Sequence, residues 1–96
     1  MTREKVLEKK LRLELDKLGG KCLKWVSPYF TGMPDRIILL PGGKVIFAEI
    51  KTTGQKLTGL QLERISMLSD LGFAAAVVDD EQALKSLIDF VKEQLA

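Results

Sequence analysis

Three charged residues lie at the adjoining ends of two apolar segments, where apolar side chains would pack better. Asp35 opens the segment 35–40, and Glu49 and Lys51 stand two residues apart at the end of the segment 44–51. Two carboxylates at one point repel each other, and proteins tolerate such a pair mainly when a cation lies between them. Oxygen ligands of this kind suit Mg²⁺ or Mn²⁺, and a lysine beside the metal could stabilise a phosphate under attack or orient the attacking water. The three residues therefore outline a site for phosphodiester hydrolysis.

A β-hairpin is the element that would bring these charges together. The segments 36–40 and 44–50 have the apolar character of central strands covered on both faces, and the Pro-Gly-Gly sequence at 41–43 suits a tight turn. Side chains alternate across a strand, so Glu49 and Lys51 share one face. In an antiparallel pair the first strand begins beside the end of the second, which unites the three charges. The alternative is an ordinary surface salt bridge, because charged pairs are common at strand ends.

The other elements follow from hydrophobic periodicity and from Gly and Pro positions. Thr58, with Gln61 three residues later, has the form of a capping box at the start of a helix. The order of elements is α-β-β-β-α-β-α, which predicts an α/β fold with a mixed central sheet flanked by helices. We expect helices over residues 3–18, 58–72 and 81–95, and strands over residues 21–26, 36–40, 44–50 and 73–78.

Length and charge limit the possible organisation and partners. The 96 residues predict a single domain over 1–96, and the net charge of +2 is ordinary for a globular protein. The charge is uneven, because residues 1–64 carry 13 Lys and Arg against 7 Asp and Glu, whereas residues 65–96 carry 2 against 6. A polyanionic partner would meet the first two thirds of the chain, although solvation of helix faces explains the same pattern.

Cysteine and histidine content excludes several kinds of site. Cys22 is the single cysteine and histidine is absent, which excludes an intrachain disulfide and zinc sites built on Cys and His. Cys22 is more simply a small buried residue of a strand. We expect no signal peptide, because the first residues have the pattern of a charged amphipathic helix, and no run of about 20 apolar residues suits a membrane span. We expect a cytoplasmic protein with no membrane partner and no small-molecule cofactor.

The charged motif and its surroundings resemble a nuclease family. The Pro-Asp pair at 34–35, followed after 13 residues by Glu-Ile-Lys at 49–51, resembles the PD-(D/E)XK nuclease signature, although Glu-x-Lys alone occurs in many proteins. More specific is the run LEKKLRLELDKLGGKCLKW, then GMPDRIILLPGGKVIFAEIK, then Gln61, which resembles the VRR-NUC branch, the small virus-type replication and repair nucleases. The similarity covers about residues 7–78. It departs in the loop 29–33, including a Met where the family more often has Val.

The resemblance implies a restriction-endonuclease-like core and a role for each motif residue. Asp35 and Glu49 would bind a divalent metal, Mg²⁺ or Mn²⁺, helped by the backbone carbonyl of Ile50. Lys51 would act on the attacking water or on the phosphate. The family name also favours a bacterial cell as the setting and a phage or prophage as the origin, with a gene of the host cell as the alternative.

Two further polar residues match family positions and also have simpler explanations. Glu8 matches the family's helical acid, which would be an additional or water-mediated metal ligand, but it could equally be an exposed helix glutamate. Gln61 matches the glutamine at the start of the helix after the motif, where it could meet the metal waters or Lys51. A glutamine at the third position of a capping box is useful without any catalytic role.

Several basic and aromatic side chains are candidates for binding nucleic acid. Lys24 and Ser27 are similar to family positions that line the site. Tyr29 and Phe30, expected in an exposed loop, could stack on bases or meet a partner, whereas Trp25 belongs more simply to the core. The remaining candidates could bind phosphates through counterion release but are individually ordinary surface charges: Lys10, Arg12, Arg36, Lys56 and Arg64.

Together these features predict a metal-dependent, structure-specific DNA endonuclease of DNA repair or replication. The resemblance implies that it resolves four-way (Holliday) junctions as a homodimer, and a chain of 96 residues has little surface with which to grip branched DNA alone. One alternative is a monomeric nuclease for flap or nicked DNA. Another is a non-catalytic module that binds nucleic acid or protein, although the presence of all three motif charges argues against it.

Overall fold

A mixed four-stranded sheet and three helices make up the part of the chain described in the computed structural model, residues 2–52 and 54–96. The order α-β-β-β-α-β-α is the predicted one, and the α/β class is confirmed. In chain order the elements are α1 (Arg3–Lys17), β1 (Lys21–Lys24), β2 (Arg36–Leu40), β3 (Lys44–Ile50), α2 (Gly59–Asp70), β4 (Ala74–Val78) and α3 (Glu81–Leu95).

The hairpin of β2 and β3 forms the centre of the sheet, whose strand order is β1-β2-β3-β4. β1 and β3 both run antiparallel to β2, whereas β4 runs parallel to β3 and is reached through α2. The hairpin turns through Gly42 and Gly43, which have φ angles of 84° and 76°. Such left-handed angles favour glycine, which explains the pair at this turn.

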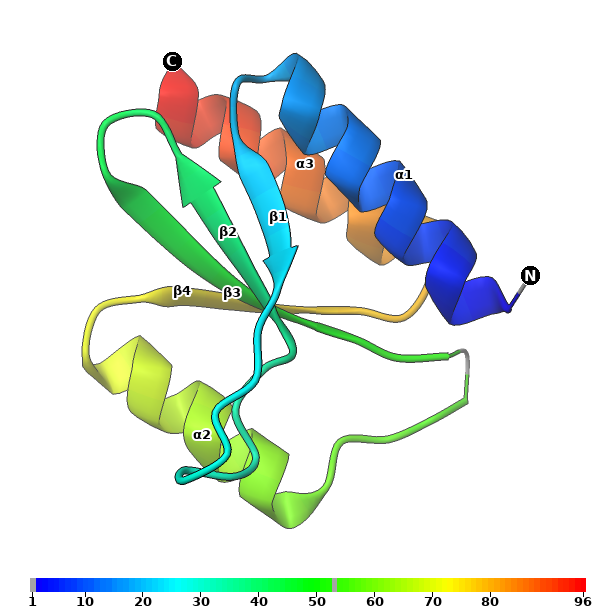
Figure 1. Cartoon of the computed structure of the whole chain (residues 1–96), viewed down its shortest axis with the longest axis vertical. Helices are drawn as coiled ribbons and strands as arrows, with labels where there is room; N and C mark the ends of the chain where they lie inside the picture. Colours follow the sequence, from blue (N-terminus) through cyan, green and yellow to red (C-terminus); the bar gives the residue numbers. More distant parts are fainter. Residues whose placement is uncertain (1, 53) are drawn as a thin grey trace.

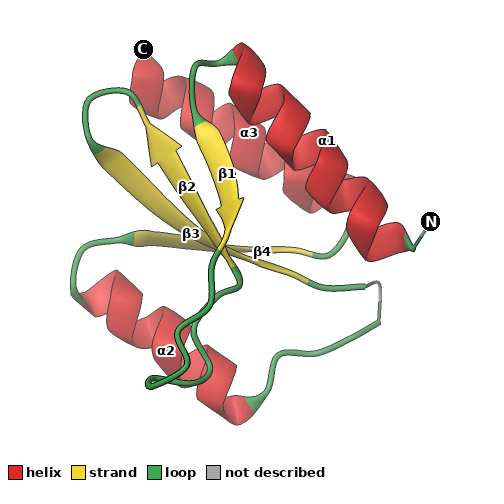
Figure 2. Ribbon diagram, viewed as in Figure 1, coloured by secondary structure: helices red, strands yellow, loops and turns green. Residues whose placement is uncertain are grey.

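The helices cover both faces of the sheet. α1 and α3 lie side by side on one face, and α2 lies on the other (Figures 1 and 2). The main core fills the space between the sheet and the α1–α3 pair, and its fully buried members are Leu7, Leu11, Leu15, Ile38, Ala48, Ile50, Val78 and Val91. On the opposite face the ring of Phe47 packs against Trp25 and Phe73, each at a centroid distance of 5.5 Å.

Helix starts are set by capping side chains. Thr2 Oγ1 accepts a hydrogen bond from the backbone N–H of Lys5 at α1, and Asp80 Oδ1 accepts from that of Ala83 at α3. Thr58 begins α2 with the predicted capping box. No helix of the described part of the chain is long and apolar enough to cross a membrane.

Two strand boundaries differ from the sequence-based expectation. β1 ends at Lys24 rather than at residue 26. The Trp25 N–H still donates to the Asp35 carbonyl, which continues the β1–β2 pairing by one residue before the chain leaves the sheet. β4 begins at Ala74 rather than at residue 73, because the Phe73 N–H donates back to the Leu68 carbonyl of α2.

Candidate active site

The end of the hairpin brings Asp35, Glu49 and Lys51 together. Arg36 pairs with Ala48 at the last position of the β2–β3 ladder, so the next residue on each side places Asp35 beside Glu49. The ammonium group of Lys51 lies 3.9 Å from Glu49 Oε2. These contacts give the three charges one common location, with β1 and β4 on either side of the hairpin.

Backbone hydrogen bonds hold this end of β3 on both edges. The Ile50 N–H donates to Asp35 Oδ1 over 3.2 Å, and the Lys51 N–H donates to the Val78 carbonyl of β4 over 2.9 Å. The N–H and C=O of one strand residue point toward the same neighbouring strand. The carbonyl of Ile50 is therefore directed to the side on which Asp35 lies.

Burial makes Glu49 an unusual carboxylate. Its side chain is only 8% exposed, against 30% for Asp35 and 18% for Lys51. Burial and the neighbouring Asp35 charge raise the pKa of Glu49 to about 7, although Lys51 and a hydrogen bond from the Asp35 backbone act in the opposite direction. A carboxylate in this setting gains more from a nearby cation than an exposed one does.

Arg36 holds the second oxygen of Asp35. Its guanidinium Nη1 lies 3.0 Å from Asp35 Oδ2 and also donates to the Asp35 carbonyl over 3.1 Å. The residue is only 9% exposed, so its position argues against the contact with DNA phosphate that its charge suggested. Sequence reasoning missed this orienting role, for which adjacency to the motif aspartate is the only signal.

The donor atoms at this site fit a hard divalent cation. Among the described residues, no group of three or more His, Cys, Asp or Glu side chains is arranged to hold a metal. The candidate ligands are instead two carboxylates, Asp35 and Glu49, and the peptide oxygen of Ile50. Mg²⁺ commonly uses one or two carboxylates and keeps several waters, so this small set of oxygen atoms suits it. The buried Glu49 carboxylate beside the half-buried Asp35 carboxylate provides a physical reason for cation binding.

Helix α1 carries two acids, Glu4 and Glu8, that stand one helical turn apart. Glu8, the acid that the resemblance selects, lies 3.6 Å from Arg12. The pKa of the Cys22 thiol is raised to about 11, mainly by burial, and the negative charge of Glu8 acts in the same direction. Glu4, one turn earlier, is the acid of α1 whose charge raises the pKa of Glu49. Glu8 stays a predicted ligand, and Glu4 makes only a small electrostatic contribution at Glu49.

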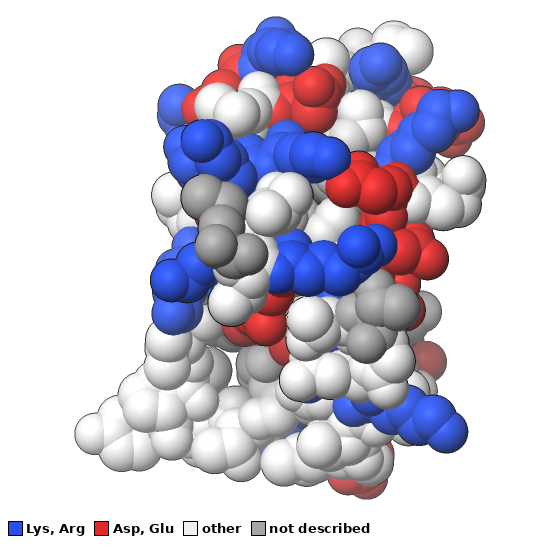
Figure 3. Space-filling model, turned by 90° about the vertical axis from the view of Figure 1, so that its right-hand side faces the viewer, with Lys and Arg blue, Asp and Glu red and all other residues white. Residues whose placement is uncertain are grey.

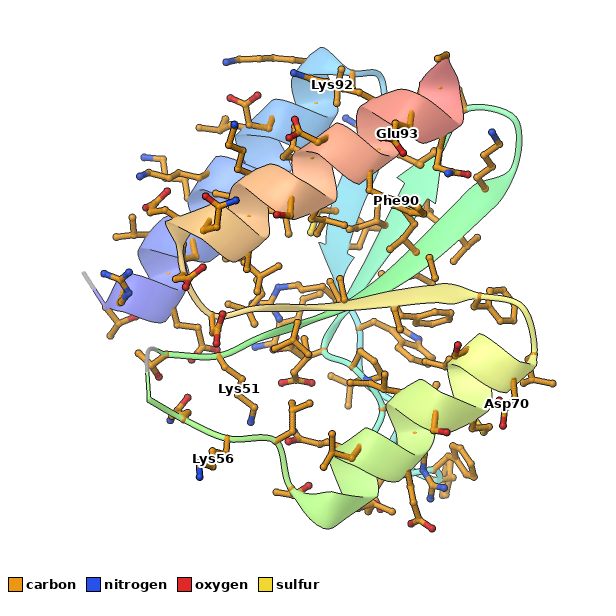
Figure 4. The ribbon with its side chains drawn as sticks, turned by 180° about the vertical axis from the view of Figure 1, so that it is seen from behind. Lys51, Lys56, Asp70, Phe90, Lys92 and Glu93 are labelled. Atoms are coloured by element: carbon orange, nitrogen blue, oxygen red, sulfur yellow. The ribbon has the colours of Figure 1, made fainter. Side chains whose placement is uncertain are left out.

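Gln61 is engaged in the cap of α2. Its Oε1 accepts from the Thr58 N–H over 2.9 Å, while Thr58 Oγ1 accepts from the Gln61 N–H over 3.1 Å. Gln61 therefore has the capping role that the sequence analysis gave as the alternative, and its contact with metal waters stays a prediction. Lys51 extends from the end of β3 toward the start of α2 and the loop that carries Lys56 (Figure 4).

The predicted nucleic-acid contacts occupy different environments. Lys24 is exposed at the end of β1, Ser27 is half-buried in the loop after it, and Lys56 is exposed. Arg64 is held against the loop between β1 and β2, with its Nε donating to the Thr31 carbonyl. Lys10 and Arg12 pair with Glu81 and Glu8, respectively. Lysine and arginine side chains are prominent on the face beside the end of β3, with acidic side chains among them (Figure 3).

Comparison with known proteins agrees with this arrangement. No family model matches the sequence. A protein of Acyrthosiphon pisum secondary endosymbiont phage 1, named "Putative nuclease p44", is 43% identical over 91 residues, which cover 95% of this chain and 97% of the phage protein. A solved structure described as a VRR_NUC domain matches with a TM-score of 0.84 at 27% identity, covering 93% of this chain and 97% of that one.

The fold, with an aspartate, a glutamate and a lysine at the end of a central hairpin, is that of the PD-(D/E)XK class of nucleases. Within that class, the chain belongs to the VRR-NUC family.

Proposed function

We propose that this protein is a metal-dependent endonuclease that hydrolyses DNA phosphodiester bonds at the site of Asp35, Glu49 and Lys51. The observation that carries the proposal is the buried Glu49 carboxylate, placed beside Asp35 and 3.9 Å from the Lys51 ammonium group. A structural salt bridge needs no second carboxylate at the same point. A hydrolytic site that binds a divalent cation needs the second carboxylate as a metal ligand.

Each residue of the site has a distinct part in the proposed reaction. Asp35, Glu49 and the Ile50 carbonyl would hold Mg²⁺ or Mn²⁺, which polarises the phosphate and acidifies bound water when it is present. Lys51 brings positive charge to the phosphate as water attacks phosphorus and one P–O ester bond breaks. The Ile50 N–H and the Arg36 guanidinium fix the orientation of the Asp35 carboxylate.

Branched DNA, and a four-way junction in particular, is the proposed substrate, with a homodimer as the active form. The chain measures only 33 × 33 × 21 Å, so two copies are needed to present two sites to a junction. A monomer would instead favour the cleavage of flap or nicked DNA. Both forms are nucleases that act at the same residues.

The edge of the sheet at β4 supports the proposed dimer. β4 is the last strand of the sheet, and a cleft of about 530 Å³ along it has no Asp, Glu, Lys or Arg among its described lining residues. Phe73 and Phe90, which line this cleft, are 41% and 37% exposed. Proteins usually protect an edge strand with charges or proline, and this edge carries neither. A second copy of the chain would cover it by symmetric contact.

A panel of DNA structures tests the function. Purified wild type and Asp35→Asn are incubated with an end-labelled four-way junction, linear duplex, flap and single strand, each with Mg²⁺, Mn²⁺ or a chelator. Paired symmetric cuts confined to the junction, dependent on metal and lost in Asp35→Asn, are the expected result. Cuts in the flap or the linear duplex, with the junction left intact, would keep the nuclease and replace the junction as its substrate. Binding without cleavage in either metal would contradict the nuclease and favour a non-catalytic binding module.

A further inference from the structure

The loop between β1 and β2, residues 25–35, presents a group of exposed apolar side chains. Tyr29 is 100% exposed, Val26 70% and Phe30 42%. Single exposed apolar residues are ordinary, but these three lie within five positions of one loop. The loop extends from the sheet alongside α2 (Figure 1). Its exposed tip is therefore a feature to be explained.

Hydrogen bonds and ring packing fix the base of this loop. The Trp25 N–H donates to the Asp35 carbonyl over 2.9 Å, which joins the first and last residues of the loop. The Trp25 ring packs on Phe47 of β3, and Pro34 is buried. Both arms are thus anchored in the sheet before the chain reaches the tip.

Helix α2 holds the tip from the other side. Arg64 Nε donates to the Thr31 carbonyl over 2.9 Å, and the Arg64 guanidinium lies 3.7 Å from the centroid of the Phe30 ring. Gly32 has a φ angle of 88°, and a Cβ at this position would lie 2.6 Å from Leu60 Cγ. These contacts tie residues 30–32 to α2, whereas the neighbouring Tyr29 side chain is fully exposed and gains no packing, as expected for a preorganised ligand contact.

The same loop joins the candidate active site. A pocket of about 290 Å³ inside the loop is lined by Asp35 together with Trp25, Ser27 and Thr31. Tyr29 stands six positions before Asp35 in the chain, so the tip lies at most about 20 Å from the candidate metal ligand, roughly the length of six stacked bases. A DNA strand at the site would pass within reach of Tyr29.

We propose that Tyr29 stacks on an unpaired or unstacked base near the cleaved phosphate, so that the 25–35 loop selects branched or distorted DNA over regular duplex. This inference rests on the proposed function, because it takes DNA as the substrate. An exposed aromatic ring suits the face of a base, which regular duplex hides and a branch point exposes. Three neighbouring side chains form too small a surface for a stable protein partner, which favours a base as the occupant.

Binding without cleavage tests the inference. Full-length wild type, Tyr29→Ala and Tyr29→Phe are titrated in chelator against fluorescent four-way junction and linear duplex of matched sequence. A second junction carries 2-aminopurine at the branch point and reports base stacking. Leu71→Ala is the matched control, because Leu71 is 67% exposed and belongs to the C-terminal end of α2.

Tyr29→Ala is expected to weaken junction binding about 10-fold, to leave duplex binding within about twofold, and to abolish the 2-aminopurine signal. Tyr29→Phe retains the ring and should bind as wild type does, as should Leu71→Ala. Equal losses on junction and duplex, or no loss at all, would overturn the inference. A change in oligomeric state in Tyr29→Ala would also overturn it, because the loop would then be a contact between protein chains.

The results distinguish the role of the 25–35 loop from the nuclease activity of the site. Junction cleavage by wild type, with no effect of Tyr29→Ala on binding, would leave the nuclease standing and remove the role of the loop. Alternatively, Tyr29→Ala could lose junction binding selectively while the wild type cuts no DNA in Mg²⁺ or Mn²⁺. That result would support recognition of DNA shape by the loop and contradict the nuclease.

Discussion

Glu49 is the residue on which the chemistry of the site depends most. It is a nearly buried carboxylate in contact with one cation, Lys51, and beside one anion, Asp35. Its raised pKa means that the folded protein holds the proton on Glu49 more tightly than the unfolded chain does. Protons and divalent cations then compete for the same oxygen atoms.

Without metal, the stability of the fold should fall as the pH rises. The unfolded chain loses the Glu49 proton near pH 4.5 and the folded chain near pH 7, so the folded state binds more protons between these values. The free energy of unfolding should therefore decrease by roughly 3 kcal/mol across this interval. Urea unfolding in chelator between pH 4.5 and 8 measures this slope. Glu49→Gln should flatten it, and an unchanged slope in that variant would assign the effect to other groups.

Metal affinity should depend on both carboxylates. Asp35→Asn and Glu49→Gln each remove one anionic ligand, so Mn²⁺ binding measured by calorimetry at pH 8 should weaken at least about 10-fold in either variant. Glu63→Gln, which changes an acid on the exposed surface of α2, is the control and should bind as wild type does. Tight Mn²⁺ binding in both site variants would place the metal elsewhere.

Among the elements, the hairpin could be predicted from the sequence almost residue by residue. Its apolar segments and the Gly42-Gly43 turn are local signals, and the alternation of side chains then places Glu49 and Lys51 on one face. The contacts of Arg36 and Arg64 could not be predicted. Arg36 follows the motif but gives no local sign of burial, and Arg64 meets Thr31 from 33 positions away in the chain.

The loop between β1 and β2 should depend on Gly32 more than its exposure suggests. Gly32→Ala introduces both an unfavourable φ angle and a Cβ that collides with Leu60, so it should lower the melting temperature and destabilise the fold by about 1 to 3 kcal/mol. Gly72→Ala is the matched control, because its φ angle of 94° is similar but its Cβ would meet nothing within 4 Å. Thermal unfolding followed by circular dichroism compares the two. Equal losses of stability in the two variants would mean that the close contact between Gly32 and Leu60 of α2 does not constrain the loop.

The molecule as a whole has a charged end and an uncharged edge. The sequence showed the imbalance of charge along the chain but could not place it, because the arrangement of side chains on a face depends on how distant elements pack. The uncovered β4 edge is likewise a consequence of strand order. The small alanine residues of β4 leave its backbone open to a further strand.

Dimer formation through this edge should be sensitive to charge. Wild type should sediment at twice the monomer mass at micromolar concentration, and Phe90→Glu should yield monomers because it places a charge in the apolar cleft. Leu13→Glu, at a residue of α1 that is 44% exposed, is the control and should stay dimeric. A monomeric wild type would remove the paired-cut mechanism, and a dimeric Phe90→Glu would place the interface elsewhere.

The rate of strand cleavage in single-turnover conditions tests the central claim most directly. Wild type and Lys51→Met are compared on a junction at saturating Mg²⁺, with Lys85→Met as a control for loss of an exposed lysine. If Lys51 stabilises charge on the phosphate under attack, its removal should slow cleavage about 100-fold or more while DNA binding is retained. A Lys51→Met protein that folds, binds DNA and cuts at the wild-type rate would contradict the assignment of this site.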